Sequence, residues 1–336
     1  MLLGLLVVLA GWLLPPTPAS EVRRAFHLSG YAQGTTYAIT YYAPDSLVTS
    51  QDITTQLAEI DASMSLYQPG SLINQFNQSA RGIVADQHLR VVVRKALQVY
   101  QATGGRFDAT VEPLVQAWGF GTRPVAAPPS AATIRAILPH IGSDKIHLKG
   151  DSLVKDLPAM HLDLNGIAQG YSVDVLATLL ERHHIQDYLV ELGGEIRVRG
   201  HKWPSGELMR IGIEQPDTSA FAAAAMQQVI CLPAGGVTTS GNYRKFRQWG
   251  GVRSAHLIDP KTGYAFQNEL ISVTVVATDA LTADAYDNAL MGMGLASALT
   301  FLKQNPALQA YLIYQRPDGT AAATATAGLQ QLLSHP

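Results

Sequence analysis

The stretch SVTVVATDALTADAYDNALMGMG (272–294) contains the two patterns that decide the fold. Residues 272–277 are rich in β-branched side chains, which predicts a strand. Residues 281–294 predict a helix that ends at a glycine. A strand therefore passes here almost directly into a helix. The way in which strands and helices alternate along the rest of the chain indicates the fold class.

One face of the predicted helix is polar. Asp284, Asp287 and Asn288 occupy positions i, i+3 and i+4, which lie on the same side of a helix. Three oxygen-bearing side chains that converge in this way suit a hard divalent cation such as Mg²⁺. A solvated helix face with a carboxylate favoured by the helix dipole is the competing interpretation, and for this motif alone it is the stronger one.

Helices and strands alternate irregularly along the rest of the chain. This favours an α+β fold over a doubly wound α/β sheet, with mixed sheets and packed helices in one compact unit or in two closely packed lobes. The Pro- and Ala-rich residues 124–132 predict a surface loop rather than a linker between domains. The other predicted strands are 34–42, 161–164, 188–193, 196–199, 209–214, 228–232 and 308–314, and the other predicted helices are 50–63, 86–103, 171–184 and 297–304.

Composition limits the classes of function. The 336 residues are 47% hydrophobic and 15% charged, which is enough to bury a sizeable core. The net charge of −2 and the absence of a basic run exclude an electrostatic footprint for nucleic acid. The single cysteine, Cys231, follows Val-Ile in an apolar context, which predicts a core thiol rather than a nucleophile.

The N-terminus indicates export. Residues 1–14 are nearly all apolar, too few to span a membrane comfortably, and PPTPAS follows them. We expect residues 1–20 to be a secretory signal cut near Ala19-Ser20, and residues 21–336 to form one domain. A buried N-terminal helix is less favoured because the segment has no polar face. Residues 8–11 resemble the start of a bacterial lipobox, but Trp12 stands where the lipidated cysteine is required, so we expect no lipid anchor there.

The motif HLDLNGIAQG (161–170) predicts a strand end, a turn and the start of a helix. Backbone amides at such a turn can bind phosphate, and its free carbonyls can ligate a metal. The motif has neither the spacing and lysine of a P-loop nor the three glycines of a dinucleotide fingerprint. An ordinary strand–helix turn explains it equally well.

Further motifs combine glycines with aromatic, hydroxyl or ionisable side chains, and each has a structural alternative. GGRFDATVEPLV (104–115), with WGFG (118–121), suits a heterocycle or a packed turn, and Tyr67 suits a stacked planar ligand or the core. GVTTSGNY (236–243) suits phosphate or sugar contacts or a plain turn. His256 and Asp259, in AHLIDPKTG (255–263), form an acid–base pair or a structural turn.

Taken in order, these motifs resemble the ApbE family, the FAD:protein FMN transferases. The resemblance runs from about residue 30 to beyond residue 294, nearly the whole mature chain. The matching segments are GTTY (34–37), MSLY (64–67) through Asn77, 105–121, 163–174, LGGE (192–195), TSG (239–241), 256–263 and 283–294.

The resemblance implies an Mg²⁺-dependent transferase that moves the FMN half of FAD onto a threonine hydroxyl of a target protein and releases AMP. Two alternatives remain open: an FAD pyrophosphatase that gives FMN and AMP, and a non-catalytic periplasmic FAD-binding protein. Targets in this family are typically membrane redox-pump subunits. The implied location is therefore the periplasm or the periplasmic face of the inner membrane, which agrees with the signal segment.

The resemblance also implies roles for individual residues. His256 is the proton acceptor or phosphate-orienting group. Mg²⁺ is held by the side chains of Asp284, Asp287 and Asn288 and by the Gly166 carbonyl. The residues implied to contact FAD are Gln33, Tyr67, Arg106, Phe107, Asp108, Asp163, Gln169 and Ile258. Three positions depart from the family pattern: Asn288 stands where threonine is usual, Gln169 where lysine is common, and Gln33 where methionine is frequent.

Overall fold

The computed structural model describes residues 22–213, 228–242, 246–249 and 252–334. The predicted signal segment at 1–20, with Trp12, lies outside these residues. Within the described ranges, no helix combines the length and apolar character needed to cross a membrane.

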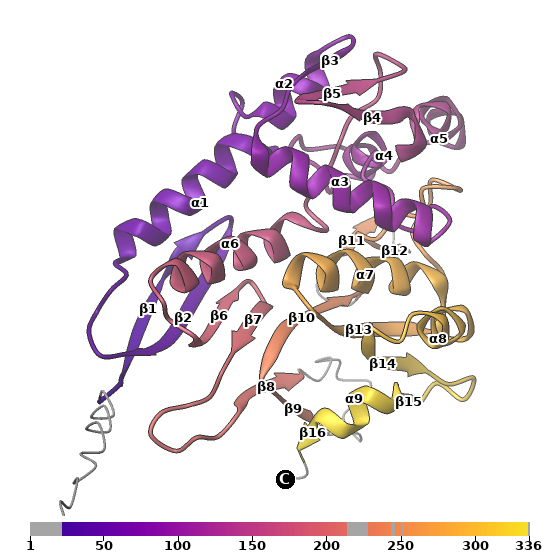
Figure 1. The fold of residues 1–336 in the computed structure, drawn as a ribbon. Coiled ribbons are helices and arrows are strands. Elements are labelled where there is room, and N and C mark those ends of the chain that lie inside the picture. The colour runs from indigo at the N-terminus through magenta and orange to yellow at the C-terminus, as the bar shows by residue number, and fades with distance from the viewer. Residues whose placement is uncertain (1–21, 214–227, 243–245, 250–251, 335–336) are drawn as a thin grey trace, which may run out of the picture.

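The largest sheet has eight strands, and every neighbouring pair in it is antiparallel (Figure 1). The strand predicted at 272–277 is confirmed as β13 (Leu270–Ala277), whose residues are all buried. Val273 and Val275 pack against the helices on one face, whereas Ile271 and Val276 pack into a separate cluster. Burial on both faces explains why apolar residues occur on both faces of this strand. The sheet order is β1 (Arg24–Ala32), β2 (Thr35–Ala43), β6 (Asp187–Leu192), β7 (Glu195–Arg199), β10 (Ala234–Gly241), β13, β14 (Gln309–Gln315) and β15 (Ala321–Ala325).

The helix predicted at 281–294 is confirmed as α7 (Ala280–Met293), which packs on β10 and β13 and lies beside α6 (Ala168–Arg182). The other predicted helices are confirmed as α1 (Ser50–Met64), α3 (Gln87–Ala102), α6 itself and α8 (Leu295–Gln304). Helix α1 begins with a capping box formed by Thr49 and Asp52.

Smaller elements complete the described part of the chain, and the α+β prediction is confirmed. The residues predicted as a loop at 124–132 remain irregular until α5 begins at Ala131. The small sheets are β3 (Gly82–Val84), β5 (Ser152–Lys155) and β4 (Ile146–Lys149); β16 (Leu333–Ser334), β9 (Gln228–Leu232) and β8 (Met209–Ile213); and β11 (Phe246–Trp249) with β12 (Val252–Ala255). The short helices are α2 (Leu72–Gln78), α4 (Glu112–Ala117), α5 (Ala131–Ile137) and α9 (Ala327–Leu332), and the 3₁₀ turns are Leu138–His140 and Ser143–Lys145.

The strand predicted at 161–164 is wrong, because no strand in the described part of the chain pairs with this segment. A side chain takes the place of the ladder: the Asn77 amide donates to the Leu162 carbonyl at 3.0 Å and accepts from the Leu162 N–H at 2.7 Å. The Lys155 ammonium donates to the Met160 carbonyl at 2.7 Å, and the Asp163 N–H donates to the Ala109 carbonyl at 2.8 Å. The segment is therefore ordered by buried polar contacts that satisfy its backbone groups.

The turn considered for 236–243 is largely a strand: β10 is hydrogen-bonded on both sides, to β7 and to β13. Its small residues have a packing reason. A Cβ atom added at Gly236 would lie 2.3 Å from the backbone nitrogen of Ala280 at the start of α7. Glycine therefore lets α7 approach the sheet closely.

Candidate functional site

One large cavity, with a volume of about 800 Å³, lies among the loops and helix ends above the large sheet. Its volume is within the range of small-molecule sites. Every residue to which the family resemblance assigns a role lines it: Gln33, Tyr67, Arg106, Phe107, Asp108, Asp163, Gly166, Gln169, His256, Ile258, Asp284, Asp287 and Asn288. Segments far apart in sequence therefore converge on one space, although their individual roles remain predictions.

The cavity wall at the sheet edge is a tight hairpin turn. Gln33 and Gly34 connect β1 to β2 and have φ values of +52° and +76°. Two consecutive positive φ angles are characteristic of a two-residue turn between twisted strands. The Gln33 side chain accepts a hydrogen bond from the Ser172 hydroxyl of α6 at 3.1 Å, so the turn is tied to the helix beside it.

Two carboxylates of α7 form the buried acidic part of the site. Asp284 and Asp287 are 3% and 1% exposed. Asp284 accepts a hydrogen bond from the Gly170 N–H at 2.8 Å. Burial raises the pKa of Asp284 to about 7, and burial together with the charge of Asp284 raises the pKa of Asp287. No ion pair in the described part of the chain includes either group, so no cationic side chain there compensates the charge of the pair.

Asn288 lies next to this pair with its amide in a definite orientation. Its Nδ2 group donates to the Gly166 carbonyl at 3.2 Å and to Asp287 Oδ1 at 3.0 Å, and its Oδ1 accepts from the Ser240 hydroxyl at 3.1 Å. The amide nitrogen, and not the oxygen expected of a metal ligand, thus faces the other predicted donors. Within the described residues, no three His, Cys, Asp or Glu side chains cluster as a metal site. A metal here would depend on two carboxylates completed by a carbonyl and an amide.

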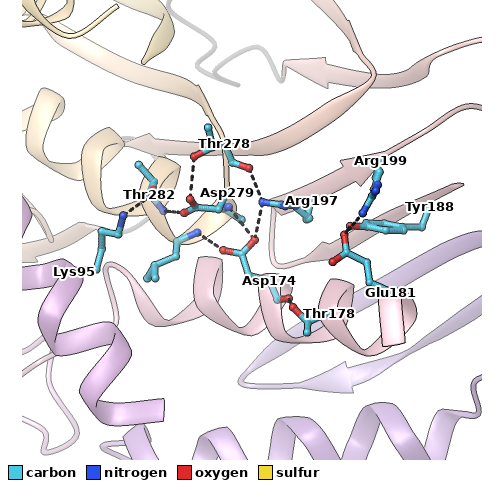
Figure 2. Close-up of polar contacts among 12 residues, drawn as sticks. Lys95, Asp174, Thr178, Glu181, Tyr188, Arg197, Arg199, Thr278, Asp279 and Thr282 are labelled. Carbon is cyan, nitrogen blue, oxygen red and sulfur yellow. Dashed lines mark hydrogen bonds and ion pairs between the residues drawn. The ribbon is translucent and has the colours of Figure 1, made fainter. Parts of the chain in front are cut away.

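The position of α7 is set at its N-terminus, where every free backbone donor has a partner (Figure 2). Asp279 accepts from the Thr282 N–H at 2.7 Å as the N-cap.

Asp174 of α6 accepts from the N–H groups of Ala280 and Leu281 at 3.0 and 2.8 Å. Arg197 of β7 donates to Asp174 at 3.4 Å and to the Thr278 carbonyl at 2.6 Å. Helix α6 therefore holds α7 through Asp174 and, one turn earlier, through Gly170.

Asp174→Asn is expected to flatten the dependence of stability on pH. Burial raises the pKa of Asp174 from 3.8 to about 6, so between these values the folded state binds more protons than the unfolded state. The free energy of unfolding therefore falls as pH rises from about 4 to about 6, by about 2 to 3 kcal/mol. The variant lacks this component. Urea unfolding across that range measures it, and Asp45→Asn, whose wild-type side chain is 81% exposed, should keep the wild-type slope. An unchanged slope in Asp174→Asn would contradict the prediction.

Asp108 is bound by the protein itself. Its Oδ1 accepts from the Thr110 N–H, the Thr110 hydroxyl and the Ser143 hydroxyl at 2.8, 2.6 and 2.6 Å, and its Oδ2 accepts from the Ser143 N–H at 3.3 Å. The side chain is 7% exposed. Burial raises the pKa of Asp108, against the hydrogen bonds from Ser143 and Thr110. Its carboxylate joins two loops at the cavity, and the hydrogen bonds that it already accepts leave little capacity to accept one from a ligand.

The other predicted contact residues differ in how they are held. Tyr67 is 68% exposed at the cavity. The Arg106 guanidinium lies 3.7 Å from the Asp259 carboxylate. The His256 ring lies edge-on to the Phe120 ring, with centroids 6.3 Å apart. The Asp163 carboxylate accepts a hydrogen bond from the Asn165 N–H at 2.8 Å. Ile258 and Phe107 are buried, and the Gln169 amide lies close to Gly193.

Asp61 of α1 also lines the cavity, and sequence reasoning missed it. Burial raises its pKa, against a hydrogen bond from Gln33. Asp61 stands on an amphipathic helix with no distinctive spacing, so only the fold brings it to the site. Six carboxyl groups line the cavity, Asp61, Asp108, Asp163, Glu195, Asp284 and Asp287, whereas Arg106 is the one Arg or Lys side chain among the described lining residues. A metal cation there would offset this excess of acidic groups toward an anionic ligand.

Comparison with known proteins is consistent with this site. Residues 33–312 match the model of the ApbE family. A Vibrio cholerae protein named FAD:protein FMN transferase is 35% identical over 326 residues, covering 94% of this chain and 93% of its own. A Haemophilus influenzae protein of the same name is 35% identical, with 90% of each chain covered.

Solved structures give the same result. The flavin transferase ApbE from Vibrio cholerae superposes with a TM-score of 0.83 at 34% identity, covering 93% of this chain and 100% of its own. The apo form of the Pseudomonas stutzeri flavinyl transferase ApbE superposes with a TM-score of 0.83 at 30% identity, covering 94% of this chain and 98% of its own.

Proposed function

Because the chain belongs to the ApbE family, we propose that it transfers the FMN half of FAD onto a threonine hydroxyl of a target protein and releases AMP, with the large cavity as its active site. The observation that carries this proposal is the convergence of the predicted FAD-binding and metal-binding residues on one cavity that contains a buried carboxylate pair.

The donors at the carboxylate pair fit Mg²⁺. Asp284, Asp287 and the Gly166 carbonyl offer the hard oxygen ligands that Mg²⁺ takes, and the Asn288 oxygen joins them if its amide turns over. These residues would hold Mg²⁺, which would supply positive charge against the negative charge that develops on the pyrophosphate as AMP leaves. The raised pKa of Asp284, about 7, means that Mg²⁺ binding strengthens as pH rises through that value and the carboxyl group ionises.

The remaining chemistry is a substitution at phosphorus. The acceptor hydroxyl oxygen attacks the FMN phosphorus, the bond from that phosphorus to the bridging oxygen breaks, and AMP leaves with the electron pair. We assign His256 to take the hydroxyl proton, because it lines the cavity and histidine is the side chain that most often serves as a general base. Arg106, held near Asp259, is the cationic side chain of the cavity that can pair with a phosphate oxygen.

The function is tested with purified protein, FAD, MgCl₂ and a target domain that carries the acceptor threonine. Flavin fluorescence that stays on the target after denaturing electrophoresis supports transfer, and the same target with alanine at the acceptor should stay unlabelled. FMN and AMP released without labelling would support the pyrophosphatase instead. Intact FAD after incubation would exclude both enzymatic activities.

His256→Ala is expected to lower kcat for transfer by about 100-fold or more while the KM for FAD changes little, because a general base acts mainly in the transition state. His161→Ala is the matched control. His161 lies 2.9 Å from Glu112 and is not among the residues that line the cavity, so its loss should leave kcat near the wild-type value. Steady-state kinetics at saturating acceptor separates the two variants. An unchanged kcat for His256→Ala would remove this residue from the proton transfer.

We also propose export to the periplasm and a membrane redox-pump subunit as the target. The apolar residues 1–14 support export, and the family resemblance supports the target class. N-terminal sequencing of protein recovered from the periplasm should begin near Ser20. Recovery of the full-length chain from the cytoplasm would contradict export.

A further inference from the structure

Asn288 stands between the proposed metal donors and β10. On one side, its Nδ2 group lies 3.0 Å from Asp287 Oδ1, 3.2 Å from the Gly166 oxygen and 3.1 Å from the Asp284 backbone oxygen. On the other side, its Oδ1 accepts from the Ser240 hydroxyl at 3.1 Å. The packing here is close: a Cβ atom added at Gly166 would lie 3.4 Å from Nδ2.

The neighbours determine which way the amide points. A backbone carbonyl only accepts hydrogen bonds. Nδ2 lies within hydrogen-bond distance of two such carbonyls, those of Gly166 and Asp284, so the NH₂ end of the amide must face them when no cation is present. The Ser240 hydroxyl can donate or accept, so it fits either end of the amide. The orientation follows from the chemistry of the partners and not from an arbitrary assignment of O and N.

We propose that the Asn288 amide is an internal substitute for the divalent cation. In the metal-free protein its NH₂ group bridges oxygens that the cation would contact, and cation binding requires the amide to turn over. After that turn, Oδ1 faces the cation, and Ser240 changes from hydrogen-bond donor to acceptor of an Nδ2–H. This inference rests on the cation site of the proposed function, and it concerns how the protein behaves when that site holds no metal.

A specific pattern of stability follows. Without a cation, the NH₂ group supplies the hydrogen bonds that hold α7 to the Gly166 turn. With a cation bound, those oxygens have another partner, so the NH₂ group contributes little. Loss of the amide should therefore destabilise the metal-free protein more than the metal-bound protein. A side chain with a purely structural role would be equally important in both states.

The test compares the melting temperatures of wild type, Asn288→Thr and Asn268→Thr, each in EDTA and in saturating MgCl₂, with no FAD or target present. Asn268 is the matched control, since its amide donates to the Met291 carbonyl of α7 at 2.8 Å and accepts from the Leu270 N–H at 3.0 Å, outside the cavity. Asn288→Thr should melt about 3 °C or more below wild type in EDTA and close to wild type in MgCl₂. Asn268→Thr should lose the same amount in both buffers. An equal loss for Asn288→Thr in the two buffers, or no loss in EDTA, overturns the proposal.

Hydrogen exchange in the wild-type protein supplies a second measurement that does not depend on a folded variant. In EDTA, both assigned Nδ2 protons of Asn288 should be protected. After the turn only Ser240 accepts from Nδ2, so one proton should lose protection when MgCl₂ is added. Unchanged protection overturns the proposal. The flavin-transfer assay is separate from both measurements. If the protein transfers FMN but Asn288→Thr loses the same melting temperature in EDTA and in MgCl₂, the proposed function stands and this inference is rejected. If the protein does not transfer FMN but the loss occurs only in EDTA, this inference stands and the proposed function is rejected.

Discussion

Asp284→Asn is expected to lower the rate of FMN transfer by about 100- to 1000-fold while the protein stays folded. Loss of one of the proposed metal carboxylates should weaken charge stabilisation in the transition state by several kcal/mol, and each 1.36 kcal/mol corresponds to a tenfold change in rate. The asparagine oxygen can still accept from the Gly170 N–H, as Asp284 does at 2.8 Å. Because the wild-type carboxyl group is buried with its pKa raised to about 7, its neutral replacement should not lower the melting temperature in EDTA.

The measurement is the initial rate of target labelling over a range of MgCl₂ concentrations, together with melting temperatures in EDTA and in MgCl₂. The rate should fall sharply in Asp284→Asn, and MgCl₂ should stabilise it less than wild type. Asp174→Asn is the matched control, since Asp174 is also a buried carboxylate with a raised pKa, on the neighbouring helix, but is not among the residues that line the large cavity. Its rate should stay within about tenfold of wild type. Full activity in Asp284→Asn would remove this residue from the metal site.

Asp108→Ala is expected to destabilise the protein by about 3 to 5 kcal/mol, a large part of the 5 to 15 kcal/mol of a typical domain. The change leaves buried donors of Thr110 and Ser143 without their acceptor, and each such group loses its hydrogen bond without regaining water. The midpoint and slope of urea unfolding measure the effect.

Asp151→Ala is the control for loss of an exposed carboxylate. Asp151 lies 2.6 Å from Arg90, but its side chain is 75% exposed, so its loss should cost less than about 1 kcal/mol. A similar cost for both variants would show that the Asp108 hydrogen bonds contribute no more than a surface ion pair. A stable Asp108→Ala protein with weak FAD binding would instead assign Asp108 to the ligand.

The long helices and the central strand could be predicted from sequence because their signals are local. α3 carries an apolar stripe that includes Leu89, Val92 and Val93 and is bounded by Asp86 and by the glycines after Thr103. β13 is rich in β-branched residues. Such periodicity depends only on the spacing of residues along one element, so no knowledge of the rest of the fold is needed.

The segment at 161–164 could not be predicted correctly, because its order comes from elsewhere in the chain. A strand and an extended segment have similar local patterns, and only the presence of a pairing partner distinguishes them. Here the partner is the side chain of Asn77, which is remote in sequence. The opposite error occurred at β10, where small residues and glycines indicated a turn although the segment is a strand. Its glycine at Gly236 is needed because α7 packs closely against the sheet there.

The sequence by itself determined the family, the thirteen predicted site residues and the common face of Asp284, Asp287 and Asn288, because motif order and helical spacing are properties of the chain. Only the tertiary structure decided that this face is buried and not solvated, that Asp108 is saturated by hydrogen bonds from its own loops, and that the nitrogen end of the Asn288 amide faces the proposed metal donors. The physical reason is that burial, pKa and amide orientation depend on which groups surround a side chain in space, and these groups come from α6, β10 and loops far from α7 in the sequence.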